Sequence, residues 1–476
     1  MMKDMPSRAR VAVAVCLCLV WGLAAVQGCD KNGAESKAKS EASEPNKDDG
    51  ESGAGDGEGA AGVLPGEREP GSVQPKSPGP EAPAIFWLAG LKGYLEPCGC
   101  SADVLLGGID RIVGYVDAAS ELYPDTVMVD AGDTFFEFEE IEEHAVPQEK
   151  AKAGVIASAV KAMGIRFSVP GERDFALGTD FYRKMLEQAG TQAIAANMKI
   201  DGTQLDGHKL VQLDEQTVLF LAYVQPELYE GIDGVEVSAL PESPDEVQAR
   251  AQMDKADTVV LVMHGNLAAT KRVLEDVGGI DFGIVGHDPR ETDQIDVVNG
   301  GHTLEAYDQG RYMGVLKLYQ RDGGDGWVDA GAGSKSELEG IEKQIAHVKE
   351  GINRFSPSQQ RENPPMLERL RDRLETLETR RDELRDTTIE VPESGDAFIY
   401  RPVPMQPGLP ISEALRKRRT EYNKSLQALA GQVDREIVPP EEGEAEFVGS
   451  NNCKACHSEA YDFWEKTQHA HAVETL

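Results

Sequence analysis

Between Ile85 and about Gln320, short apolar runs alternate with segments in which apolar residues recur every three or four positions. Short apolar runs are typical of buried strands, and the second pattern is typical of amphipathic helices. The predicted strands are IFWLAG, TVMVDAGDT, TVLFLAYV, TVVLVMH and DFGIVGH. The predicted helices are RIVGYVDAASELY, KAGVIASAVKAMG, DFYRKMLEQAG and ATKRVLEDVGG. This alternation predicts an α/β domain over residues 84–322, with helices that flank the sheet.

Two shorter regions follow this domain. Residues 335–387 carry apolar residues at alternating three- and four-residue steps on two highly charged helices. These residues are Leu338, Ile341, Ile345, Val348 and Ile352, then Leu367, Leu370, Leu374, Leu377 and Leu384. The spacing predicts a helical hairpin, and the alternative is a coiled coil that joins two copies into a homodimer. Residues 388–432 predict a pair of strands followed by a helix.

The start of the chain has the layout of a secretion signal. Residues 1–28 combine a basic beginning, an apolar run of about 16 residues and a small-residue ending. The ending Val-Gln-Gly-Cys resembles the lipobox of bacterial lipoproteins, which implies that Cys29 is lipidated and anchors the protein to a membrane facing the periplasm. Either the inner or the outer membrane fits this motif. Residues 29–83, rich in Gly, Ser, Pro, Glu and Lys, predict a disordered tether.

Charge and cysteine content narrow the range of possible functions. The formal net charge is −35, from 83 acidic against 48 basic residues, which argues against a nucleic-acid partner because such proteins need a basic face. Of seven cysteines, two lie in the signal and one is Cys29. The other four form two close pairs, Cys98 with Cys100 and Cys453 with Cys456. Such pairs predict local chemistry and no disulfide framework.

Polar motifs directly follow several predicted strands. In chain order they are VDAGDT, VPGERDFALG, VMHGN and IVGHDP. Over about 230 residues, this order resembles the metallophosphatases of the 5′-nucleotidase (calcineurin-like) type, whose motifs are D-x-H, G-D, G-N-H-E, a His loop and G-H-x-H. In that family two metal ions activate a water for attack on phosphorus. The resemblance implies that Asp133, His264 and His287 are metal ligands, with Asp133 in the bridging position.

Other positions depart from the family pattern. Gly90 and Lys92 stand where the first strand should deliver D-x-H. Glu172 and Arg173 replace the Asn-His pair of G-N-H-E, and Pro289 replaces the last histidine. The histidine expected to stabilise the leaving oxygen is therefore an arginine. These departures argue against hydrolysis by the usual two-metal route.

A cysteine pair lies on the loop that should carry the lost ligands. The run EPCGCS, followed by GGIDR, resembles a variant of this fold found in proteins that also carry cytochrome segments. That variant implies a substituted site in which Cys98, Cys100 and Glu172 join the remaining ligands. Thiolates with histidines suit zinc or iron, and carboxylates add manganese as a third divalent candidate. An inert scaffold and a retained hydrolase are the alternatives.

The last residues contain the motif C-x-x-C-H at Cys453, Cys456 and His457. This spacing is typical of covalent haem c attachment, in which the histidine ligates iron. A zinc site that also includes His469 is the alternative. The run EFVGSNNCKACHSEAYDFWEKTQHAHAVETL resembles the start of multihaem cytochromes of the c-554 type. The resemblance implies that His457 is the proximal ligand and that His469 ligates this haem or a neighbouring one.

Multihaem cytochromes continue with further C-x-x-C-H motifs. We therefore expect residues 446–476 to be a truncated haem segment. The alternatives are a haem that packs against the α/β domain and a haem that a partner cytochrome completes. Together these features predict a membrane-anchored, extracytoplasmic electron-transfer protein on a divergent metallophosphatase scaffold. A phosphoester hydrolase with an appended cytochrome segment and an inert binding or assembly subunit are the alternatives.

Overall fold

The structure is a computed structural model. It describes residues 69–98, 105–123, 125–247, 249–253, 255–290, 292, 294–321, 326–353, 364–386, 389–430, 450–454, 456–465, 467 and 470. Several predictions concern residues outside these ranges: the signal, the lipidation site Cys29, most of the tether, Cys100 and His469. They stay predictions.

The first sheet contains five strands in the order β15-β16-β14-β1-β4. Their bounds are β1 Ala84–Leu88, β4 Thr126–Asp130, β14 Tyr312–Tyr319, β15 Val328–Asp329 and β16 Ala397–Pro404. Strand β1 runs parallel to β4 and antiparallel to β14. Every residue of β1 is buried, so this strand is covered on both faces.

The second sheet contains six strands in the order β12-β13-β11-β10-β8-β7. Their bounds are β7 His208–Leu213, β8 Gln216–Val224, β10 Thr258–His264, β11 Phe282–Val285, β12 Val297–Val298 and β13 Gly301–Glu305. The four central strands are parallel, and the two edge strands are antiparallel to their neighbours.

The two sheets pack face to face around one hydrophobic core. Successive residues of a strand point to opposite faces, and on β10 Val260 and Val262 join this core while Leu261 joins a second cluster that includes residues of α5. Across the sandwich, the rings of Phe282 and Phe398 lie 5.1 Å apart. Two small sheets complete the strands: β2 Pro97–Cys98 with β3 Leu106–Gly107, and β6 Thr203–Gln204, β5 Met198–Ile200 and β9 Val235–Val237.

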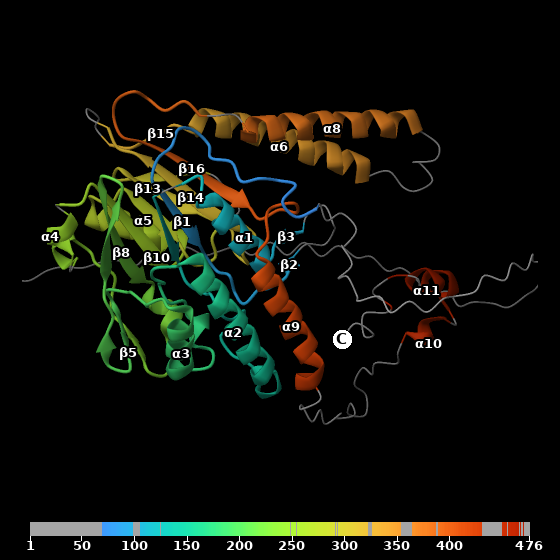
Figure 1. Cartoon of the computed structure of the whole chain (residues 1–476), viewed down its shortest axis with the longest axis horizontal. Helices are drawn as coiled ribbons and strands as arrows, with labels where there is room; N and C mark the ends of the chain where they lie inside the picture. Colours follow the sequence, from blue (N-terminus) through green and yellow to red (C-terminus); the bar gives the residue numbers. More distant parts are fainter. Residues whose placement is uncertain are drawn as a thin grey trace, which may run out of the picture. The chain divides into compact units, whose positions relative to one another are not determined.

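Helices flank the sheets, as the sequence predicts. Their bounds are α1 Ile109–Ala119, α2 Val146–Met163, α3 Thr179–Ala189, α4 Arg250–Met253, α5 Leu267–Val277, α6 Ala332–Asn353, α8 Pro364–Asp386, α9 Glu413–Ala430, α10 Asn451–Lys454 and α11 Ser458–Trp464. Helix α1 is anchored on β1 through Phe86, whose ring contacts Tyr115 and Tyr123. Helices α2 and α9 pack against each other and against α1 (Figure 1). The predicted α/β fold class is confirmed.

The region predicted as a helical hairpin forms α6 and α8, which lie side by side (Figure 1). Ile341, Ile345 and Leu384 are buried between them. The apolar seam is therefore covered by the second helix of the same chain. Dimerisation through this hairpin stays a prediction.

The region 388–432 differs from the predicted strand pair. Its described part, residues 389–430, contains a single strand, β16, which lies in the first sheet between β14 and β15. Its pairing with β14 runs from Tyr312 opposite Pro404 to Tyr319 opposite Ala397. Because this pairing spans the intervening helical hairpin, the local sequence pattern gives no sign of it. Among the described residues, no helix combines the length and apolarity needed to cross a membrane.

Candidate metal centre

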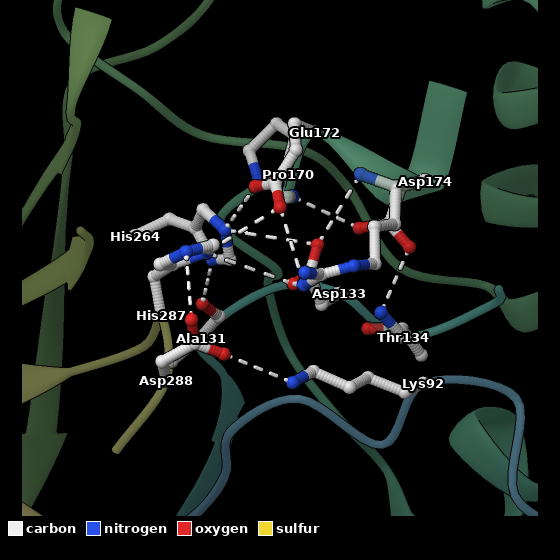
Figure 2. Close-up of polar contacts among 12 residues, drawn as sticks. Lys92, Ala131, Asp133, Thr134, Pro170, Glu172, Asp174, His264, His287 and Asp288 are labelled. Carbon is white, nitrogen blue, oxygen red and sulfur yellow. Dashed lines mark hydrogen bonds and ion pairs between the residues drawn. The ribbon is translucent and has the colours of Figure 1, made fainter. Parts of the chain in front are cut away.

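The candidate centre lies where strands of both sheets end. Asp133 follows β4, His264 is the last residue of β10, and His287 comes two residues after β11. Glu172 lies in the loop before a short 3-10 helix, Arg173–Phe175. Ligand sites of α/β folds form beyond the carboxyl ends of their parallel strands, and these loops meet at such a point. Figure 2 shows the four side chains directed toward one another.

The four side chains offer ligand atoms that all lie within 4.8 Å of one another. His264 Nε2 lies 2.9 Å from Glu172 Oε2 and 3.7 Å from Asp133 Oδ1. His287 Nδ1 lies 3.4 Å from Glu172 Oε1 and 3.9 Å from Asp133 Oδ2. Three of the residues are buried, and the His287 side chain is 12% exposed. Two imidazoles and two carboxylates form a donor set that suits zinc, iron or manganese.

His264 is held in one orientation. Its Nδ1 lies 2.7 Å from the Ala131 carbonyl oxygen, which can only accept, so Nδ1 donates and Nε2 is directed at the cluster. A histidine that ligates a metal commonly donates its other ring proton in this way. Burial acts to lower the pKa of His264, but the negative charges of Asp133 and Glu172 outweigh it and raise the pKa to about 9.

Two ligand atoms in the cluster lack hydrogen bonds. Glu172 Oε1 and His287 Nδ1 are both buried, and neither is hydrogen-bonded. Buried polar atoms nearly always have a partner. Apart from the Arg173 guanidinium, 3.2 Å from Glu172 Oε1, the oxygen and the nitrogen face each other over 3.4 Å, an arrangement that fits shared coordination of a cation. Although burial alone would raise it, contacts with His264 and His287 hold the pKa of the Glu172 carboxyl well below its ordinary value. The carboxylate is therefore in the form that binds metal.

Arg173 closes one side of the cluster. Its guanidinium forms an ion pair with Asp133 Oδ2 and lies 3.2 Å from Glu172 Oε1. The Arg173 backbone N–H also donates to Asp133 Oδ1 over 3.3 Å. Arg173 thus neutralises part of the carboxylate charge and fixes the position of Asp133.

Behind the ligands, Asp174 ties two loops together. Its carboxylate accepts backbone N–H bonds from Thr134 (2.8 Å) and Phe135 (2.9 Å) on one loop, and from Gly171 (2.9 Å) on the other. Burial and then nearby negative charges raise the pKa of Asp174 to about 7. The sequence motifs did not single out this residue, although it stands in the same GERD run as Glu172.

The Asp133 loop needs glycine at its tightest point. Gly132 has φ +100°, and a Cβ there would lie 2.3 Å from His264 Nδ1. Asp133 itself has φ 54°, in the left-handed region that non-glycine residues seldom adopt. The backbone at this turn is therefore shaped to bring Asp133 beside His264.

Comparison with solved structures identifies the fold around this centre. A sulfate thiohydrolase SoxB from Thermus thermophilus is similar with a TM-score of 0.50, at 12% identity over 74% of this chain and 62% of that one. The domain has a metallophosphatase-like fold. A 5′-nucleotidase precursor from Thermus thermophilus is similar over 74% of this chain and 60% of that one, with TM-score 0.48 and 12% identity. The calcineurin-like phosphoesterase YfkN from Bacillus subtilis is 20% identical, with TM-score 0.41, over 51% of this chain and 87% of that one.

The chain spans less than two thirds of the length of the two Thermus proteins. No protein-family model matches the sequence, and no curated protein is significantly similar to it. The likeness therefore concerns the fold of the metallophosphatase-like domain.

Lys92 lies at the edge of the centre, on the loop that follows β1. Its ammonium lies 2.7 Å from Asp308 Oδ2 and 3.1 Å from Asp288 Oδ1. Burial acts to lower the pKa of Lys92, but its bonds to the two carboxylates outweigh it and raise the pKa. The sequence marks Lys92 as a departure from the family, but nothing local points to Asp308 as its partner.

The predicted cysteine ligands are not placed at the centre by the described residues. Cys98 belongs to β2, where it pairs with Leu106 of β3. Its side chain and Cys100 lie outside the described part of the chain. Their participation in a metal site stays a prediction.

The C-x-x-C-H motif follows the metallophosphatase-like domain in the sequence. Cys453 lies in α10, and Cys456 and His457 lie on the turn between α10 and α11. The Cys456 and His457 N–H groups both donate to the Cys453 carbonyl, over 3.3 and 2.9 Å. Both thiols are free and exposed, and His457 is exposed. The two cysteines and the histidine are thus held within one helical turn.

Proposed function

We propose that this chain is an exported, membrane-anchored electron-transfer protein whose metallophosphatase-like domain binds one divalent transition-metal ion and whose tail carries haem c. The observation that carries the metal assignment is the cluster of Asp133, Glu172, His264 and His287, with two buried ligand atoms that lack hydrogen bonds. A bound ion would supply Lewis-acid chemistry or, as iron or manganese, a change of oxidation state.

The residues around the cluster favour a metal centre for electron transfer over a centre that hydrolyses phosphoesters. Arg173 is already engaged by Asp133 and Glu172, and it stands where the family has the histidine that stabilises a leaving oxygen. Lys92 is engaged by Asp288 and Asp308. These internal ion pairs leave neither cation directed at an open substrate position.

The exposed turn at the C-x-x-C-H motif supports the haem assignment. Haem attachment needs two reduced thiols and a histidine close together and accessible. Cys453 and Cys456 are free and exposed, and His457 follows directly on the same turn. Export through the predicted signal would deliver them to the compartment where c-type haem is assembled.

Three measurements on the full chain, expressed in a host with c-type haem maturation, test the proposal. A haem-stained denaturing gel with a pyridine haemochrome spectrum should show covalent haem, and its absence would contradict electron transfer. Metal analysis of the purified protein should show a bound divalent ion that Asp133→Asn removes. In fractionated cells, Cys29→Ala should move the protein from the membrane to the soluble fraction.

A phosphoesterase is the second candidate, favoured by Asp133, His264 and His287 at family ligand positions within one cluster. Its test is hydrolysis of bis-(4-nitrophenyl) phosphate by the metal-loaded chain. Activity that Asp133→Asn and His264→Ala both abolish would support it. Activity that neither change affects would show that this centre is not the source.

A further inference from the structure

A fixed positive charge lies next to the four-ligand cluster. The Lys92 ammonium bonds to Asp308 and Asp288, and its side chain is only 11% exposed. The Lys92 backbone N–H donates to the Asp133 carbonyl over 2.6 Å, which fixes this loop against the loop of a cluster ligand. Figure 2 shows the Lys92–Asp288 contact beside the four side chains.

Two of the three places at which the sequence departs from the family pattern lie on these loops. Lys92 follows β1, where the family pattern requires D-x-H, and Asp288 directly precedes Pro289, where it requires the last histidine. The third departure, at Glu172 and Arg173, contributes Glu172 to the cluster, and His287 of the cluster directly precedes Asp288. Two of the departures therefore lie on the Lys92 side of the centre, and an ammonium occupies that side.

The backbone around Gly90 leaves little room for a side chain at the first position of the family's D-x-H pattern. Gly90 has φ +59°, and a Cβ there would lie 3.1 Å from the Asp308 Cβ and 3.3 Å from the Lys92 Cε. Lys92 has φ 51°, also in the left-handed region. A ligating side chain at residue 90 would meet both members of the Lys92–Asp308 pair.

We propose that the Lys92 ammonium takes the place of the second cation of a two-metal centre, so that Asp288 and Asp308 are neutralised by the chain itself. This inference rests on the proposed metal site. An ammonium neutralises carboxylates but has no open coordination position for a water or substrate oxygen. The centre then binds one divalent ion, and removal of the lysine charge exposes a second, carboxylate-rich site.

The test is the number of Mn²⁺ ions bound per metal-stripped chain, measured by equilibrium dialysis with elemental analysis. We expect one ion for the wild type and one additional, weaker ion for Lys92→Ala and for Lys92→Met, which keeps the aliphatic length. Lys92→Ala combined with Asp308→Asn should lose the additional ion. Lys209→Ala is the matched control. Lys209 forms a 2.8 Å ion pair with Asp206, and neither residue belongs to the centre.

The outcomes separate this inference from the proposed function. A wild type that binds no ion would refute the proposed metal site, while an added ion in Lys92→Ala would still support the role of the lysine. A wild type that binds two ions would overturn the inference alone. No added ion in Lys92→Ala and Lys92→Met, both folded by circular dichroism, would also overturn it.

Discussion

The buried candidate metal centre and the exposed C-x-x-C-H turn are built in opposite ways. The centre draws four candidate ligands from three loops and the end of β10, between Asp133 and His287, and three of the four are buried. The turn places Cys453, Cys456 and His457 within five consecutive residues, all exposed. A centre assembled by the fold depends on the packing of the domain, whereas the turn depends on local backbone bonds. A substitution that disrupts one of these two sites should therefore leave the other unchanged.

The largest expected effect is on the turn. Cys453→Ser together with Cys456→Ser removes both thiols that would bond to the haem vinyl groups, so covalent haem should be lost completely. The metal content should be unchanged, because no described ligand of the centre lies on the tail. A haem-stained gel and metal analysis measure the two effects. Lys454→Ala, on an exposed neighbour, is the control, and covalent haem in the double variant would contradict the assignment.

The reverse experiment removes a ligand of the centre. His264→Ala deletes a fully buried imidazole and should weaken divalent-metal binding by at least about 100-fold, since even partners outside the ligand sphere cost about 10- to 100-fold. Haem attachment should be unchanged. Competition with a chelating dye measures the affinity. The control is His144→Ala, whose side chain is half exposed and pairs with Glu142. Equal affinity in His264→Ala and wild type would remove His264 from the ligand set.

The sequence predicts the elements and motifs whose pattern lies within a short stretch of the chain. Buried strands such as TVVLVMH and amphipathic helices such as ATKRVLEDVGG show their periodicity in a short window, and they form β10 and α5. Asp133, His264 and His287 could be selected because each follows a predicted strand within a recognisable motif. The C-x-x-C-H motif is likewise complete within five residues.

Other features depend on contacts between distant residues. The partner of Lys92 at the centre, Asp308, is 216 positions away and belongs to no motif. Strand β16 pairs with β14 across the helical hairpin, so its place in the first sheet follows from tertiary packing. The three N–H bonds that Asp174 accepts also depend on how two loops meet. Patterns of neighbouring residues carry no information on such pairs.

The role of β16 gives a stability test of the contrast between domain and tail. Phe398, on β16, is fully buried and contacts Phe282 and His302 of the opposite sheet. Phe398→Ala should lower the free energy of unfolding of the α/β region by about 3 to 5 kcal/mol. Phe463→Ala on the tail, where the side chain is 75% exposed, should change it by less than about 0.5 kcal/mol.

Denaturant unfolding followed by circular dichroism measures both variants. If β16 and the helix after it formed an independent unit, Phe398→Ala would shift only a separate minor transition. A single transition shifted as a whole would show that β16 is integral to the sandwich.

The smallest effect concerns pH. Burial raises the pKa of Asp281 from 3.8 to about 6, although its carboxylate accepts the Val259 N–H over 2.7 Å. Between these pH values the folded chain keeps a proton that the unfolded chain has lost. The free energy of unfolding therefore falls as pH rises from about 4 to 6, by at most about 3 kcal/mol, and the loss is fully present above pH 6.

Asp281→Asn should remove this component, because the amide oxygen can still accept the Val259 N–H and carries no charge. The difference between the wild-type and variant unfolding profiles, measured from pH 4 to 7, isolates it from other titrating groups. Asp462→Asn on the exposed α11 is the matched control and should leave the profile unchanged. Parallel profiles for wild type and Asp281→Asn would show that the Asp281 carboxyl is solvated in the folded chain, and that burial in the sandwich does not act on it.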